Sequence, residues 1–316
     1  MVELTSSVES HWHDALEWVL EEGEKVSPRG KPIRELLNFS FEVDSKLPLI
    51  TNGVRKVNYR FAVAELTWYL LGRGDVESIA RYNKNLAQFS ADGATFVGAY
   101  GPAIAAQLPV VISQLREDAD TRQAVLGIWR PGLPKTKDVP CTLTLQFLLR
   151  KEELHLIVNM RSNDLWLGFP YDVFSFTALQ RAVAYALGVE PGSYHHNVGS
   201  LHVYESDLEK IERALNAYYT TKTNNSIKLP GFSIDSAQQD DTRVVFEEAL
   251  SIAGAAKLAK LLENYDDVFV QQYLAILVKP RVTLEHGSGQ PLPLWYAEQR
   301  AAMERHAQVE HADSDL

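Results

Sequence analysis

A charged turn at residues 150–153 separates two apolar segments, residues 143–149 and 154–160, and this pairing constrains the fold more than any other feature. Each segment is rich in Leu, Ile or Val and has the length of a strand, so together they predict an antiparallel hairpin. Residues 173–187 then predict a long apolar helix that ends at Gly188. A hairpin followed by a buried helix predicts an α/β (α+β) fold.

Other segments fit the same fold class. Residues 60–71 predict a second buried helix, and residues 124–129 predict a short strand before the hairpin. Ser6 and Glu9 have the spacing of a capping box, which predicts an N-terminal helix that starts there and stops at Gly23. Two further strands are expected at residues 202–204 and 268–278.

No internal repeat or linker divides the 316 residues, so we expect a single domain over residues 1–316 with a polar tail at about 301–316. With 46% apolar and 23% charged residues, the chain has the balance of a globular protein with a sizeable core. The net charge of −10 argues against nucleic acid as the main partner. It leaves room for a small anionic substrate in a basic pocket.

Cys141 is the single cysteine, which excludes an internal disulfide and favours a reducing cytoplasm. No apolar run approaches the ~20 residues that span a bilayer, and the N-terminus lacks a signal-peptide pattern. We therefore expect a cytoplasmic protein that does not bind a membrane. His195 and His196 are adjacent, while His11 and His13 share a helix, so the histidines predict no metal site.

Reactive side chains crowd into the central region of the chain. They lie in the motifs Pro140-Cys141-Thr142, Arg161-Ser162-Asn163-Asp164, residues 167–172 (LGFPYD) and His202-Val203-Tyr204. Each has an ordinary explanation, since a lone cysteine is usually a small buried residue and Asp172 has the position of a helix N-cap. A basic loop at residues 26–34 is ordinarily a solvated surface loop. Spacing alone leaves the function open.

In their order and intervals, these motifs resemble the core signature of the thymidylate synthase family. The helical segment around Glu65, the loop around Tyr100 and the segment at Arg122 resemble three further family motifs. The resemblance extends over roughly residues 8–280. It implies a thymidylate-synthase-like fold, with a large mixed β-sheet flanked by helices, and a homodimer that forms through the sheet face.

The resemblance also implies a role for each matched residue. Cys141 is expected to add to C6 of a pyrimidine nucleotide as a thiolate, so nearby positive charge should lower its pKa. Glu65 and Tyr100 are expected to handle protons at the base through ordered water. Asp164 and Glu65 are the expected folate contacts. The implied substrate-binding residues are Arg29, Arg122, Arg161 and Ser162 for phosphate, His202 and Tyr204 for the sugar, and Asp172 for the base.

Two of these assignments carry a qualification. Arg122 resembles the arginine that this family lends to the nucleotide phosphate of the partner subunit. Either Arg29 or Arg34 matches the flexible phosphate-loop arginine, and we favour Arg29.

One departure from thymidylate synthases concerns base recognition. They carry asparagine where this chain has Asp172, and that amide donates to O4 of uracil. An aspartate can instead accept from the 4-amino group of cytosine and pair with N3–H. In this aspartate the chain resembles the deoxycytidylate (dCMP/CMP) hydroxymethylase branch of the family, and Thr142, in place of the family's histidine, agrees with that resemblance. Ser162 matches the deoxynucleotide pattern, so dCMP is favoured over CMP.

A second departure concerns the product. The tryptophans that shield the reaction centre in the family fall on small residues near Ala87 and Ser90. Water could then attack the exocyclic methylene, which would give hydroxymethyl and not methyl, with 5,10-methylenetetrahydrofolate as cosubstrate. The polar C-terminus replaces the family's apolar closing segment, so the sequence leaves the enclosure of the folate open.

Three alternatives stay open on the sequence. The chain could be a cytidylate C5-methylase with the same site, or a thymidylate synthase that tolerates Asp172. It could also be a catalytically silent relative that binds nucleotide or RNA. The presence of Cys141 together with Glu65, Tyr100 and Arg161 argues against the silent relative, because binding alone needs no thiol.

Overall fold

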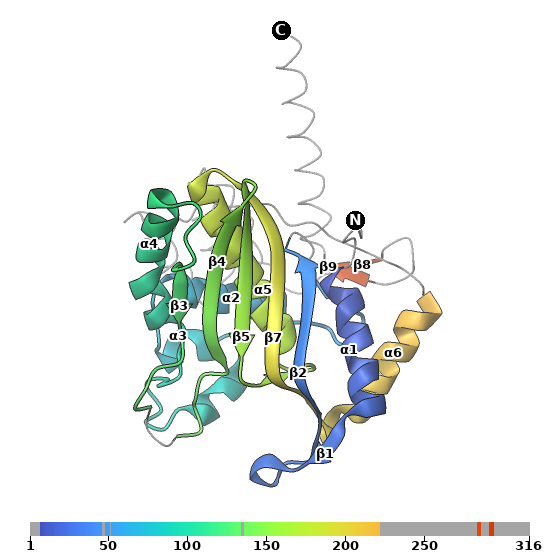
Figure 1. Cartoon of the computed structure of the whole chain (residues 1–316). Helices are drawn as coiled ribbons and strands as arrows, with labels where there is room; N and C mark the ends of the chain where they lie inside the picture. The colour runs from blue at the N-terminus through green and yellow to red at the C-terminus, as the bar shows by residue number, and fades with distance from the viewer. Residues whose placement is uncertain are drawn as a thin grey trace.

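The computed structural model describes residues 7–45, 48–50, 52–133, 136–221, 283–285 and 291–293. The predicted strand at residues 268–278 and the predicted tail at residues 301–316 lie outside the described residues. A mixed sheet lies at the centre of the described fold, with helices behind it (Figure 1).

Within the described residues, the sheet has seven strands. In chain order they are β1 (Glu24–Val26), β2 (Ile33–Asp44), β3 (Val125–Gly127), β4 (Thr142–Arg150), β5 (Glu153–Met160), β6 (Asn163–Asp164) and β7 (Glu190–Tyr204). Their spatial order is β1-β2-β7-β5-β4-β3, and β6 lies beside β7. β7 runs parallel to β5 and β6, and the other neighbours are antiparallel. The predicted large mixed sheet is therefore confirmed. β8 (Thr283–Glu285) and β9 (Pro291–Pro293) form a separate antiparallel pair.

The described helices lie behind the sheet or beyond its edges in Figure 1, and none of them crosses the face turned to the reader. The α-helices are α1 (Val8–Glu22), α2 (Tyr59–Leu70), α3 (Val76–Ala80), α4 (Gly101–Glu117), α5 (Phe169–Leu187) and α6 (Leu208–Thr221). Short 3-10 helices are η1 (Pro28–Gly30), η2 (Lys84–Phe89) and η3 (Glu205–Asp207). None of the described helices is both long enough and apolar enough to cross a membrane.

The hydrophobic core lies between the covered face of the sheet and α5. In β5 every second residue is buried, and Leu154, Leu156 and Val158 are each 0% exposed. Val173 and Phe174 of α5 are buried to the same degree. Burial of such a side chain stabilises the fold by roughly 1.5–3 kcal/mol, so this alternation fixes which face of the strand meets the helices.

The predicted hairpin is confirmed as β4 and β5, which pair antiparallel across the charged turn. The predicted helix at residues 60–71 is α2, within one residue at either end. The helix predicted at residues 173–187 is α5, which begins four residues earlier. Asp172 therefore lies inside the first turn and not at the N-cap, a position where the helix dipole favours a carboxylate.

Three predicted boundaries differ from the structure. The N-cap of α1 is Ser7, whose Oγ accepts from Ser10 N at 3.3 Å, so the capping box at Ser6 and Glu9 is wrong. The short strand predicted at residues 124–129 is β3, which keeps only three residues. The strand predicted at residues 202–204 is only the end of β7.

Candidate active site

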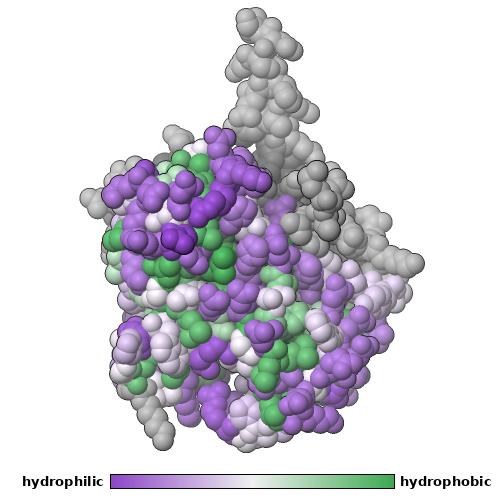
Figure 2. Space-filling view, in the orientation of Figure 1, coloured by the Kyte–Doolittle hydropathy of each residue, from purple (hydrophilic) through white to green (hydrophobic). Residues whose placement is uncertain are grey.

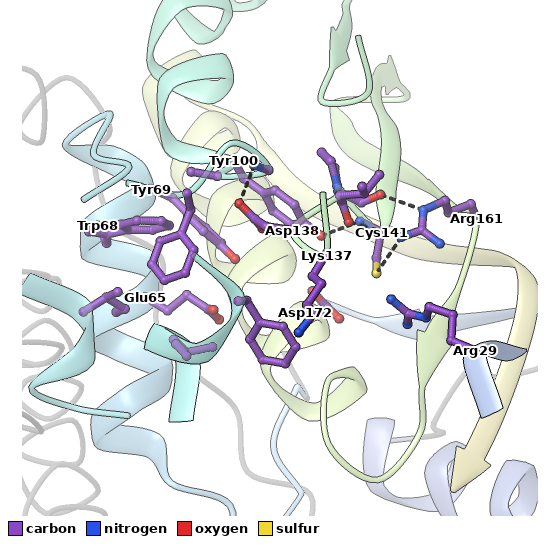
Figure 3. A pocket seen from close by; sticks show the side chains of 18 residues that line it. Arg29, Glu65, Trp68, Tyr69, Tyr100, Lys137, Asp138, Cys141, Arg161 and Asp172 are labelled. Atoms are coloured by element: carbon purple, nitrogen blue, oxygen red, sulfur yellow. Dashed lines mark hydrogen bonds between the residues drawn. The ribbon is translucent and has the colours of Figure 1, made fainter. Parts of the chain in front are cut away.

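A cavity of about 310 Å³ lies beside the end of β5 and the first turn of α5 (Figure 3). Its walls come from α2, α3, η2, α5, the loop before α4 and the loop before β4, so residues far apart in the sequence meet there. Six of the predicted site residues line it: Arg29, Glu65, Tyr100, Cys141, Arg161 and Asp172.

Cys141 ends the loop that leads into β4, and its thiol lies beside the guanidinium of Arg161 (Figure 3). Arg161 Nη2 donates to Cys141 Sγ at 3.7 Å. The same side chain donates from Nε to Pro140 O at 2.8 Å and from Nη2 to Val139 O at 3.1 Å. The loop that carries the thiol therefore also holds the arginine in place.

Burial raises the pKa of the Cys141 thiol above its ordinary value. Arg161 and Arg29 lower this pKa, whereas Asp172 and Asp164 raise it. The expectation of a lowered pKa is therefore wrong: the arginines act in the expected direction, but desolvation outweighs them. Since the thiol is the resting form at neutral pH, its proton has to leave as the sulfur attacks.

Tyr100 immediately precedes α4 and connects it to the cysteine loop. Its hydroxyl accepts from Cys141 N at 3.3 Å and from Thr142 N at 3.2 Å. The ring stacks on Tyr69 and Phe176, with centroids 5.4 Å and 6.3 Å away. Burial holds the pKa of Tyr100 well above its ordinary value, so its phenol keeps a proton that it can donate.

Glu65 lines the cavity from α2, and Trp68 and Tyr69 line the same wall (Figure 3). Their spacing from Glu65, three and four residues, places all three on one helix face and was visible in the sequence. Burial raises the pKa of Glu65 to about 8, the Asp172 carboxylate raises it too, and a hydrogen bond from Tyr69 lowers it. Glu65 is therefore protonated at neutral pH and can supply a proton inside the cavity.

Asp172 contributes the second carboxyl group. Its Oδ2 accepts from Asn163 Nδ2 at 2.7 Å. Burial raises the pKa of Asp172 to about 7, the Asn163 hydrogen bond lowers it, and Asp164 raises it. Both protonation states of the group are accessible near neutral pH. The group can therefore act as an acceptor-only carboxylate or as a carboxylic acid with one donor and one acceptor.

Arg29 and Arg34 have different environments. Arg29 lines the cavity and has a φ of 54°, a left-handed conformation that is uncommon for a residue other than glycine. Arg34 Nη1 donates to Leu20 O at 2.7 Å and so ties β2 to α1. This geometry favours Arg29 over Arg34 as the phosphate-loop arginine, and that role stays a prediction.

Four predicted residues lie next to the cavity residues without lining the cavity: Ser162, Asp164, His202 and Tyr204. Ser162 directly follows Arg161. Tyr204 forms a side-chain hydrogen bond with Arg29, and its ring meets His202 edge to face at 5.5 Å. Asp164 Oδ1 accepts from the backbone N of residue 166 at 2.8 Å, which fixes the turn before α5. The structure thus groups Asp164, His202 and Tyr204 beside Arg29.

Arg122 is the predicted site residue that the structure does not bring to this cavity. It is exposed, and its backbone oxygen accepts from Gln146 Nε2 at 3.0 Å. This location agrees with the expectation that Arg122 acts at the site of a partner subunit, and that role stays a prediction.

Leu86 and Phe89 are the residues of η2 that line the cavity. The expectation that Ala87 and Ser90 leave the reaction centre facing small side chains is therefore wrong. A 3-10 helix has three residues per turn, so residues 86 and 89 lie on the same side. The wall is apolar, and Phe89 is 42% exposed, so its rim remains open to solvent.

Sequence reasoning did not identify Lys137 and Asp138, which also line the cavity. Asp138 Oδ2 accepts from Gly98 N at 2.7 Å, and this contact joins the loop before α4 to the loop before β4. Their only signal in the sequence is their position a few residues before Cys141.

One wall of the cavity could pack against a flat ring system. Trp68, Leu86, Phe89 and Phe96 make this wall apolar and partly aromatic. Trp68 Nε1 is buried and has no hydrogen-bond partner among the described residues, so it is available to donate to a ligand. Within the described part of the chain, no group of three or more His, Cys, Asp or Glu side chains could hold a metal ion.

Comparisons with known proteins agree with this geometry. The family model for thymidylate synthase matches residues 10–249, more than half of the chain. The chain is 40% identical over 216 residues to a deoxyuridylate hydroxymethyltransferase of Bacillus phage SP01, covering 61% of this chain and 56% of that protein. It is 36% identical over 167 residues to a deoxyuridylate hydroxymethyltransferase of Pseudomonas phage M6, covering 50% and 48%. The chain therefore spans about half the length of these relatives.

Thymidylate synthases are also similar. The chain is 29% identical over 183 residues to thymidylate synthase 1 of Bacillus spizizenii, covering 54% of this chain and 65% of that protein. Among solved structures, thermostable thymidylate synthase A from Bacillus subtilis superposes with a TM-score of 0.60 at 24% identity, covering 66% of this chain and 84% of that one. This likeness confirms the predicted fold. From the matched family model and the shared fold, the chain belongs to the thymidylate synthase family.

Proposed function

We propose that the chain transfers a one-carbon unit to C5 of a pyrimidine nucleoside monophosphate, with 5,10-methylenetetrahydrofolate as cosubstrate. Family membership supports the proposal, and so does a cavity that gathers a thiol, two carboxyl groups and two arginines. The observation that carries it is the position of Cys141 Sγ, 3.7 Å from Arg161 Nη2, in the cavity that Glu65 and Asp172 also line.

Cys141 acts as the nucleophile in this proposal. Its sulfur bonds to C6 of the base while the thiol proton passes to water in the cavity, and the electron pair of the C5–C6 double bond moves to make C5 nucleophilic. Arg161 and Arg29 favour the developing thiolate, and their charges also suit a nucleotide phosphate. When bound, the folate supplies a one-carbon unit at the oxidation level of formaldehyde. The apolar wall of the cavity excludes bulk water from part of this space.

Glu65 and Tyr100 manage the protons. Glu65, with a pKa of about 8, holds a proton at neutral pH that it can deliver to the base. Tyr100 keeps its own proton while its oxygen accepts from the backbone of the cysteine loop. Loss of the C5 proton would accompany departure of the folate and leave an exocyclic methylene on the base, and the ionised form of Glu65 would accept this proton through ordered water. Addition of water to the methylene and release of the Cys141 thiolate from C6 then restore the C5–C6 double bond.

Asp172 selects a cytosine nucleotide, and we favour dCMP over CMP. As a carboxylate it accepts from the 4-amino group and pairs with a protonated N3 through charge-assisted hydrogen bonds. A uracil would direct its O4, an acceptor, toward a second acceptor. A mismatch of this kind in a buried site reduces catalytic efficiency by orders of magnitude.

Deoxyuridylate is the second candidate substrate, because two relatives are named for it. The pKa of about 7 for Asp172 gives that alternative a physical basis. A neutral carboxyl presents one donor and one acceptor, the same pattern as an asparagine amide. The two candidates thus correspond to two protonation states of one residue.

Hydroxymethyl is the proposed product. The two phage relatives are named hydroxymethyltransferases, and the exposure of Phe89 leaves a path for water at the rim of the cavity. Small residues at positions 87 and 90 do not support this product, because Leu86 and Phe89 line the cavity there. Methyl transfer stays the alternative fate of the same one-carbon unit.

A homodimer completes the proposed site. Arg122 lies outside the cavity of its own chain, and the open face of the sheet carries no described helix (Figure 1). On that face Figure 2 shows hydrophobic patches among hydrophilic ones. We infer that two chains pair through this face and that each lends Arg122 to the phosphate of the other.

A covalent trap tests the proposed activity. The chain is incubated with methylenetetrahydrofolate and either 5-fluoro-dCMP or 5-fluoro-dUMP, because fluorine at C5 blocks loss of the group that must leave. Intact-protein mass spectrometry should detect a ternary adduct on Cys141 with 5-fluoro-dCMP, and none with Cys141→Ser. An adduct with 5-fluoro-dUMP alone favours the second candidate. A folded chain that gives no adduct with either analogue contradicts the proposal and favours a silent binding protein.

A further inference from the structure

A row of buried polar side chains leads from Asp172 into the core. Asn163 Nδ2 donates to Asp172 Oδ2 at 2.7 Å, and Asn163 Oδ1 lies 3.0 Å from His196 Nε2. His196 Nδ1 lies 2.7 Å from the hydroxyl of Tyr194. Asn163 is 3% exposed, and both His196 and Tyr194 are 0% exposed. Four polar groups thus form one continuous chain of hydrogen bonds, away from water.

The chemistry of these groups fixes which partner donates in each hydrogen bond of the row. Burial lowers the pKa of His196 to about 3, so the imidazole is neutral and carries one N–H. A carboxylate at Asp172 only accepts, which turns the amide nitrogen of Asn163 toward it and the amide oxygen toward His196. His196 then donates from Nε2 and accepts from Tyr194 at Nδ1. Each of the three hydrogen bonds then joins one donor to one acceptor.

Rigid elements hold all members of the row. Tyr194 and His196 are two residues apart on β7, so both point to the face of the sheet that packs against α5. Asn163 belongs to β6, which pairs with β7, and Asp172 belongs to the first turn of α5. None of the three supporting residues lines the cavity. They reach the base only through Asp172.

We propose that Asn163, backed by His196 and Tyr194, is a positioning residue that sets base selection by donating to Oδ2 of Asp172 and so keeping the carboxylate an acceptor toward the base. The inference rests on the proposed function, because it assumes that Asp172 contacts the base. An acceptor fixed at this point matches the amino group of cytosine and opposes O4 of uracil.

Asn163 also affects the charge of Asp172. Its hydrogen bond lowers the pKa of Asp172, against burial and the neighbouring Asp164 carboxylate. The titratable groups that interact with Asp172 are Glu65 and Tyr69 of α2, Tyr100 before α4, Cys141 before β4, Asp164 of β6 and Tyr194 of β7. Loss of the Asn163 donor therefore raises this pKa and favours the neutral form, which suits uracil.

Substrate preference measures this role directly. We expect Asn163→Ala to lower the ratio of kcat/KM for dCMP to kcat/KM for dUMP by about tenfold or more, the effect of one hydrogen bond to a charged group. Tyr194→Phe should lower the ratio less, because it acts two contacts further away. Tyr59→Phe is the matched control, since Tyr59 is also a buried tyrosine but its hydroxyl contacts the Ile50 backbone instead.

The pH profile gives a second readout. Activity on dCMP needs ionised Asp172 and rises with pH through its pKa, so this rise should move to higher pH in Asn163→Ala. A merely structural defect would lower activity at every pH without that shift. In an Asp172→Asn background, Asn163→Ala should leave the substrate ratio unchanged, because the group through which it acts is gone.

The outcomes distinguish a failure of the inference about Asn163 from a failure of the proposed function. A wild-type chain that prefers dCMP, with the same ratio and pH profile in folded Asn163→Ala, overturns the inference alone. A wild-type preference for dUMP overturns the proposed function and the inference with it. If Asn163→Ala fails to fold, Tyr194→Phe, which removes one oxygen, takes its place in the test. A lower ratio of kcat/KM for dCMP to kcat/KM for dUMP than in wild type supports the inference, and an unchanged ratio overturns it.

Discussion

Single residues in the cavity hold their protons more tightly than the same residues do in water. Burial raises the pKa of Cys141, of Glu65 to about 8 and of Asp172 to about 7. For Glu65 this creates an acid that is still protonated at neutral pH. For Cys141 it opposes thiolate formation, and the arginines only limit the rise. The sequence located all three residues but not their protonation, because desolvation depends on what surrounds a side chain and not on its neighbours in the chain.

The raised pKa of Cys141 predicts slow alkylation near neutral pH. Iodoacetamide reacts with the thiolate, so its rate should rise with pH and reach its midpoint above that of the same chain unfolded in urea. Cys141 is the single cysteine, so mass spectrometry follows one site. Rapid alkylation of the folded chain at pH 7, faster than in urea, would mean that the arginines outweigh burial.

Glu65 links activity to stability. The folded chain keeps its proton up to a pKa of about 8, whereas the ordinary value is 4.5, so the unfolded chain releases it first as pH rises. The contribution of Glu65 to the free energy of unfolding therefore falls between pH 4.5 and pH 8. We expect Glu65→Gln to lose activity but to be more stable than wild type at pH 8, by on the order of 1–3 kcal/mol.

Urea unfolding at about pH 5 and about pH 8 measures this effect. The stability gap between Glu65→Gln and wild type should be small at the lower pH and larger at the higher one. Glu77→Gln is the control, because Glu77 forms only an exposed ion pair with Arg81. A gap of equal size at both pH values would show that proton binding by Glu65 is not its cause.

At the scale of elements, prediction succeeded where hydrophobic periodicity was regular and failed where it was broken. β4, β5, α2 and α5 follow apolar patterns, and the sequence located each of them. β2 was missed because polar residues interrupt its alternation and Asn38 has a φ of 54° inside the strand. Most of β7 was missed because Pro191 and Gly192 near its start are typical of turns. Tertiary pairing with β5 and β2 overrides those local signals.

Two loops that meet at Gly98 position the catalytic elements, so a larger residue there should be harmful. A Cβ at Gly98 would lie 2.8 Å from Asp138 Oδ1 and 3.1 Å from both Asp138 O and Pro140 N. We expect Gly98→Ala to separate the loop of Tyr100 from the loop of Cys141. Stability should fall by roughly 1–3 kcal/mol, as for other overpacked sites, and kcat should fall at least about tenfold.

Thermal melts and steady-state kinetics check this prediction. Gly127→Ala in β3 is the matched control, because a Cβ there meets nothing closer than 3.9 Å. Full activity of Gly98→Ala would contradict the view that contact between these loops positions the nucleophile.

At the scale of the whole molecule, the described helices cover one face of the sheet, and none of them lies on the other face (Figure 1). Half-buried polar residues lie on the open face, where Asn159 Nδ2 donates to Thr144 Oγ1 at 3.1 Å and His155 Nδ1 lies 2.8 Å from Ser193 Oγ. The fold class followed from the hairpin and the family motifs. The arrangement of subunits rests on the resemblance and on the position of Arg122 outside its own cavity.

Subunit complementation tests the proposed dimer. Arg122→Ala and Cys141→Ser should each be inactive or nearly so. In a mixed dimer, the subunit that keeps Cys141 receives an intact Arg122 from its partner. Equal amounts of the two variants are denatured, mixed and refolded together. About a quarter of wild-type activity should return, because half the dimers are mixed and each mixed dimer has one complete site out of two. Failure to restore activity, with a dimer in sedimentation, would place Arg122 outside the site.

The central claim is that Cys141 and Asp172 direct a one-carbon unit to C5 of a cytosine nucleotide. Its most direct test is to incubate the purified chain with methylenetetrahydrofolate and each of dCMP, CMP and dUMP, and to identify the products by mass spectrometry. The predicted result is a hydroxymethyl group on the cytosine nucleotide, with dCMP preferred. Turnover of dUMP alone, or no turnover of any nucleotide by the folded chain, would contradict the account.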